Sequence, residues 1–119
     1  MRPHEIIKNL QLPTRDLRRA IPDVYAGFSK MHDAALSDGA LDMKTKELIA
    51  LAVAVSRGCE GCIALHARTL ANLEASDDEV AEALGVTIVM DGGPAASAYG
   101  PQAFEAFQQF TKAAERIAE

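Results

Sequence analysis

Apolar residues recur at three- and four-residue spacing along most of this chain, with polar residues between them. That spacing is the period of an α-helix that buries one face. The segments that interrupt it are short and rich in Gly, Pro, Asp and Ser. The pattern therefore predicts an all-α fold of about six helices with no sheet. The predicted helices span residues 15–20, 23–37, 43–57, 60–75, 77–91 and 102–119.

Polar and glycine residues mark the ends of the two best-defined helices. Asp42 is suited to cap the start of helix 43–57, and Gly58 is suited to end it. Ser76 and Glu79 form a capping box that opens helix 77–91. The Gly-Gly-Pro sequence at residues 92–94 should end or kink that helix, since Pro cannot donate a helical hydrogen bond.

The N-terminal third gives weaker signals. Residues 1–13 show no clear helical pattern, and we expect this segment to end at Pro13. Thr14 can then cap a short helix that follows. Pro22 suits the first position of the following helix. The spacing also predicts apolar faces on that helix and on the last one, at Val24, Phe28, Met31 and Ala35 and at Phe104, Phe107 and Ala114.

Both cysteines and one histidine lie in the most continuously apolar stretch, residues 47–66. At about 100° per residue, Cys59, Cys62 and His66 fall within an arc of roughly 60° on one helix face, so both thiols are expected to be half-buried. If the chain folds back at Gly58, Glu47 lies about 16 Å from the turn and His66 about 12 Å. The two side chains should then meet across a helical hairpin.

This arrangement suits an activated thiol. A carboxylate at Glu47 would orient the imidazole of His66, and the imidazole would take the proton of Cys62. A helix N-terminus and a neighbouring base both favour the thiolate, which is the reactive form of cysteine. The residues thus follow the pattern of a nucleophile activated by a base that a third group orients.

Other interpretations of the same residues stay open. Cys59, Cys62 and His66 could bind zinc, with a fourth ligand from His4, His32 or a carboxylate. A thioredoxin-like motif would follow a strand, and none is expected before the cysteines. His66 could also be a buried structural histidine. We expect a core or surface role for His32 rather than a catalytic one.

The pattern E-x11-C-x-x-C-x-x-x-H, formed by Glu47, Cys59, Cys62 and His66, resembles the AhpD-like alkylhydroperoxidases of the carboxymuconolactone decarboxylase family. The resemblance extends over about residues 35–112 and includes the Gly-Gly-Pro-Ala segment ahead of the last helix. It implies one AhpD-like domain over residues 1–119, with the central hairpin carrying the cysteine pair.

The family resemblance also implies a role for each residue. Cys62 would attack a hydroperoxide and pass through a sulfenic acid, and Cys59 would donate a proton and then close a disulfide. His66 and Glu47 would form the proton relay. A dithiol or redox protein would reset the pair, and relatives assemble as trimers or hexamers. A disulfide reductase, a redox sensor or a lactone-type decarboxylase on the same fold are the alternatives.

Gly61 departs from the pattern of those family members that have a second histidine just before the second cysteine. This departure shortens the proton relay that the resemblance implies. It also puts full peroxidase activity in question, although the cysteine pair itself favours redox chemistry over decarboxylation.

Composition narrows the class of protein further. With 119 residues, 49% of them hydrophobic and 24% charged, the chain suits one globular domain. A net charge of −5 and sparse aromatic residues argue against a nucleic-acid partner. We see no export signal, no stretch long enough to span a membrane, and no haem, flavin or nicotinamide motif. Two close cysteines then suggest a reducing cytoplasm and chemistry without a cofactor.

Overall fold

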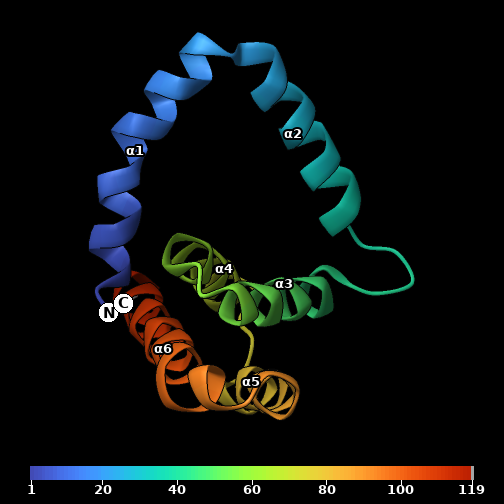
Figure 1. The fold of residues 1–119 in the computed structure, drawn as a ribbon, viewed down its shortest axis with the longest axis vertical. Coiled ribbons are helices and arrows are strands. Elements are labelled where there is room, and N and C mark those ends of the chain that lie inside the picture. Colours follow the sequence, from blue (N-terminus) through green and yellow to red (C-terminus); the bar gives the residue numbers. More distant parts are fainter. Residues whose placement is uncertain (119) are drawn as a thin grey trace.

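Every regular element in residues 1–118, which the computed structural model describes, is a helix (Figure 1). The all-α prediction is therefore confirmed, and with it the expectation of about six helices. In chain order the elements are α1 (Pro3–Ala20), α2 (Pro22–Leu36), α3 (Met43–Arg57), α4 (Glu60–Asn72), α5 (Asp77–Asp91), a π-helical turn η1 (Ala95–Tyr99) and α6 (Gly100–Ala118).

Helix α4 is the centre of the core and packs against α1, α3 and α6, while α5 covers the other side of α3. Helices α4 and α6 pack against each other, and small residues of both, Ala64 and Ala67 of α4 and Ala103 of α6, are completely buried. Larger side chains fill the remaining space, and Leu51, Ile63, Leu70 and Phe107 have no exposed surface. This core fixes the position of α4 and of the cysteines at its start.

The predicted helix ends are present. Asp42 caps α3, because its side chain accepts a hydrogen bond of 2.8 Å from the backbone N–H of Thr45. Gly58 ends α3 with φ of +65°, a left-handed conformation that glycine adopts without a steric penalty. The chain reverses there, so α3 and α4 form the predicted antiparallel hairpin.

The start of α5 is held by two sets of polar contacts. Ser76 and Glu79 form both hydrogen bonds of the capping box, at 3.1 and 2.9 Å. Lys44 of α3 also lies 2.7 Å from the carboxylate of Glu79. The ammonium of Lys44 lowers the pKa of the Glu79 carboxyl, and the same contact raises the pKa of Lys44.

The prediction for the N-terminal segment is wrong. Helix α1 begins at Pro3 and continues through Pro13 to Ala20, so residues 1–13 are no separate lead-in and Thr14 caps nothing. Pro13 removes the helical hydrogen bond to the carbonyl of Asn9. Both residues are exposed, however, so that water can satisfy the carbonyl, while Ile7 anchors the preceding turns in the core.

Helix α2 begins at Pro22 as predicted, but its apolar face is not covered by the rest of the chain. Val24, Phe28 and Met31 remain 64%, 56% and 62% exposed. The reason is visible in Figure 1, where α1 and α2 form an arch that holds α2 away from the core helices. Within residues 1–118, no helix is both long and apolar enough to cross a membrane.

Candidate functional site

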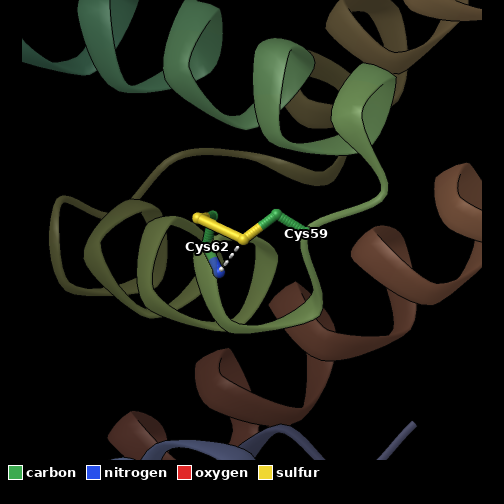
Figure 2. The surroundings of a disulfide bond; sticks show 2 residues. All are labelled: Cys59 and Cys62. Carbon is green, nitrogen blue, oxygen red and sulfur yellow. Dashed lines mark hydrogen bonds between the residues drawn. A yellow bond between two sulfur atoms is a disulfide. The ribbon is translucent and has the colours of Figure 1, made fainter.

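The cysteines lie at the start of α4, where Cys59 is the N-cap and Cys62 is in the first turn. Their Cα atoms are 5.3 Å apart, which is within the range of a disulfide, and the two sulfur atoms are bonded. The Sγ of Cys59 also accepts a hydrogen bond of 3.3 Å from the backbone N–H of Cys62 (Figure 2). The helix start thus supplies positive dipole potential to the sulfur pair.

Glu47 and His66 meet across the hairpin as its geometry predicts. The Nδ1 of His66 lies 2.7 Å from Oε2 of Glu47, although the residues are nineteen positions apart. Glu47 is only 4% exposed, so its carboxylate depends on this partner for a hydrogen bond. With the proton on Nδ1 donated to the carboxylate, Nε2 is the ring nitrogen left to act as a base.

Burial differs between the two cysteines. Cys59 is partly buried, as expected, whereas Cys62 is exposed rather than half-buried. The physical reason is the orientation of α4, whose deepest face is formed by Ile63, Ala67 and Leu70. Cys62 and His66 lie beside that buried face of α4, and both line a pocket.

The pocket has a volume of about 630 Å³ and lies between α2, α3 and α4. Its walls are mostly apolar, and the polar side chains that reach it include Glu47, His66 and His32. A concave, largely apolar pocket with a few convergent polar groups is the usual form of a small-molecule site. The remaining lining residues are Phe28, Asp33, Leu36, Ser37, Met43, Cys62, Leu65 and Thr69.

The contribution of α2 to this pocket was not anticipated. His32, for which we expected a core or surface role, is an exposed residue, and it also lines the pocket that contains Cys62. Phe28 and Leu36 line the same wall, one helical turn to either side of His32. The four-residue spacing of these residues is visible in the sequence, but nothing in the sequence tells which helix they face.

Gly61 is bordered by α1. A Cβ atom added at this glycine would lie 3.1 Å from a methyl carbon of Leu10. Contacts that short are uncommon, so a side chain here would require Leu10 to move. The missing second histidine is therefore matched by a leucine that reaches into the same space.

Metal ligation has little support from the arrangement of donors. No group of three or more His, Cys, Asp or Glu side chains in residues 1–118 is placed to hold a metal ion. His4 stacks against Phe110, with ring centroids 4.4 Å apart, and it lines a second groove of about 610 Å³ together with Lys8 and Arg68. That groove includes none of the four predicted site residues.

Comparison with known proteins agrees with the motif. The model of the carboxymuconolactone decarboxylase family matches residues 22–115. A crystal structure of an apo carboxymuconolactone decarboxylase family protein from Legionella pneumophila superposes with a TM-score of 0.87 and 42% identity, covering 92% of this chain and 96% of that one.

Two curated relatives are also similar, and both are described as uncharacterised. An uncharacterised protein of Cupriavidus necator is 39% identical over 80 residues, covering 67% of this chain and 71% of the relative. An uncharacterised protein of the cox locus of Paracoccus denitrificans is 37% identical over 76 residues, covering 64% and 66%.

Proposed function

Because the chain belongs to the carboxymuconolactone decarboxylase family, we propose that it is a thiol-dependent oxidoreductase that reduces organic hydroperoxides. The observation that supports this proposal is the set of groups around one pocket. Cys62 opens onto it, Cys59 is within bonding distance of Cys62, and the Glu47–His66 pair lies one helical turn away. Family membership and the cysteine pair support a redox role, and the peroxidase activity is our proposal.

In the reduced protein, His66 takes the proton of the Cys62 thiol. The imidazolium that forms is stabilised by the buried carboxylate of Glu47 at 2.7 Å, and the thiolate is stabilised by the start of α4. The positive and negative charges appear together, so the net charge of the site does not change. This transfer converts Cys62 into the reactive form.

The thiolate then attacks the terminal oxygen of the hydroperoxide. A sulfur–oxygen bond forms and the oxygen–oxygen bond breaks, which gives a sulfenic acid on Cys62 and an alkoxide that takes up a proton and leaves as an alcohol. Cys59, as its thiolate, attacks the sulfenic sulfur. A disulfide forms, and the displaced hydroxide leaves as water after it gains a proton. The disulfide in the structure corresponds to this oxidised state.

An external dithiol or a redox protein would return the disulfide to two thiols. The cysteine pair stores two electrons, so no additional redox group is needed within the chain. The exposure of Cys62 is consistent with attack by such a donor, because thiol–disulfide exchange requires access to one sulfur.

Substitution of the two cysteines tests the proposal. With dithiothreitol as reductant, Cys62→Ser should abolish consumption of tert-butyl hydroperoxide. Cys59→Ser should still react once and leave a sulfenic acid that a dimedone reagent traps, but it should not form the intramolecular disulfide. Unchanged turnover by Cys62→Ser would reject the assigned role of this residue.

A disulfide reductase or redox sensor is the second candidate. It is favoured by the exposed position of Cys62, which a protein thiol or a protein disulfide could reach. The two functions differ in their oxidising substrate. Reduction of a protein disulfide such as that of insulin, at a rate above that of hydroperoxide, would favour this second candidate.

We also propose that the chain forms a homo-oligomer, a trimer or a hexamer. The support is the uncovered apolar surface of the arch, where no residue of α2 is buried and Leu12 and Leu17 of α1 are 59% and 50% exposed. Light scattering coupled to size exclusion measures the assembly.

We also propose that the protein is located in the cytoplasm, because a catalytic C-x-x-C is typical of reducing compartments.

A further inference from the structure

Two imidazoles line the pocket, and they lie on different helices. His66 belongs to α4, as do both cysteines, and its Nδ1 is held by Glu47. His32 belongs to α2, which lines the same pocket together with α3 and α4. The proton relay described above uses only the first of these histidines.

The geometry of peroxide cleavage distinguishes groups on the side of the attacking sulfur from groups on the side of the leaving oxygen. Displacement at oxygen requires the attacking sulfur, the attacked oxygen and the leaving oxygen to lie nearly in line. Cys62 attacks from α4, so the leaving oxygen lies on the far side of the attacked oxygen from the sulfur. Cys59 and His66 lie on the side of the nucleophile, since they are on the same helix within about one turn of Cys62.

His32 is the pocket-lining residue outside α4 that suits proton donation. Histidine exchanges protons near neutral pH more readily than any other side chain. The Nδ1 of His32 is 3.7 Å from a carboxylate oxygen of Asp33, the next residue of α2. Phe28 lies beside it, with ring centroids 6.2 Å apart, and lines the same pocket.

On the basis of the proposed function, we infer that His32 donates the proton to the departing alkoxide. Cys62 forms its bond to the terminal oxygen, the oxygen–oxygen bond breaks, and the alkoxide takes a proton from the imidazolium of His32. The sulfur is oxidised to the sulfenic acid, the peroxide is reduced to an alcohol, and solvent returns a proton to His32. His32 thereby takes over the proton donation that the family resemblance implies for Cys59.

The nature of the leaving group gives a direct test. The alkoxide released from tert-butyl hydroperoxide is strongly basic and needs a proton as it leaves. Acetate, released from peroxyacetic acid, is weakly basic and leaves without one. The experiment measures the second-order rate constant for oxidation of the pre-reduced protein by each compound, using rapid quenching and a count of free thiols.

His32→Gln should lower the rate constant with tert-butyl hydroperoxide by about a hundredfold or more, the range of general acid catalysis, and should change the rate constant with peroxyacetic acid by less than about twofold. His4→Gln is the matched control, because His4 lines the other groove and should leave both rate constants unchanged. Because His32 is exposed, its substitution should not affect folding, which circular dichroism checks.

Two results would overturn the inference while leaving the proposed function intact. One is a His32→Gln protein that reacts with both compounds as fast as the wild type. The other is an equal loss with both compounds, which would mean that His32 positions the substrate and donates no proton. A wild-type protein that does not react with tert-butyl hydroperoxide would instead reject the proposed function.

Discussion

Replacing Glu47 by Gln tests the Glu47–His66 pair most directly. Gln has nearly the same shape, so the buried site stays filled and a neutral hydrogen bond to Nδ1 remains possible. What is lost is the negative charge 2.7 Å from the imidazole. The predicted consequence is that His66 accepts the proton of Cys62 less readily, and less of the reactive thiolate is present at neutral pH.

The magnitude follows from the type of bond. A hydrogen bond to a charged group contributes about 1.5–3 kcal/mol, against about 1 kcal/mol for a neutral one. The difference, roughly 0.5–2 kcal/mol, corresponds to a rate reduction of about 2- to 30-fold at 1.4 kcal/mol per factor of ten. The loss should shrink at alkaline pH, because the thiol then ionises without the imidazole.

The assay compares reaction rates of the reduced thiol with and without the carboxylate. In a Cys59→Ser background, alkylation of Cys62 by iodoacetamide reports the thiolate fraction from pH 5 to 10, and peroxide consumption is measured with both cysteines present. Glu82→Gln on α5 is the control, since it removes the same charge from an exposed site. If Glu47→Gln gave the wild-type alkylation profile, the carboxylate would not take part in activating the thiol.

Two further predictions concern the scaffold that holds the site. Gly58→Ala should destabilise the fold by about 1–3 kcal/mol in urea denaturation, because the residue has φ of +65° and its Cβ would lie 2.9 Å from the ring of Tyr99. Gly85→Ala, a helical position with nothing within 4 Å of its Cβ, should instead stabilise it slightly. The Lys44 ammonium lowers the pKa of the Glu79 carboxyl in the folded protein. The pair therefore stabilises the fold at pH values above the ordinary carboxyl pKa, and this stabilisation is lost as the pH falls through the lowered pKa of Glu79. Glu79→Gln should therefore reduce stability at pH 7 but not at pH 2, and an equal loss at both would contradict this.

Local signals in the sequence predicted the parts of the fold that depend on neighbouring residues. Asp42, Gly58 and the Ser76 capping box mark helix ends through short-range hydrogen bonds and backbone preference, and all are found as expected. The contact of Glu47 with His66 could also be predicted, because it needs only two helices of known length and the turn that joins them.

Features that depend on packing between distant elements were not predictable in this way. Pro13 lies inside a helix because its surroundings are exposed to water and the preceding turn is anchored by the core. The place of His32 in the pocket depends on the angle between α1 and α2, for which the sequence has no local signal. The exposure of Cys62 follows from how α4 is rotated in the core, which the helical period alone leaves open.

The contact between Leu10 and the space above Gly61 bears on how this site can vary in related sequences. A histidine introduced at residue 61 alone would press against the leucine, whereas a smaller residue at position 10 would make room for it. The two positions lie on different helices but share one volume. Natural variation should therefore exchange them together, and a protein engineer who wishes to restore the second imidazole should redesign α1 at the same time.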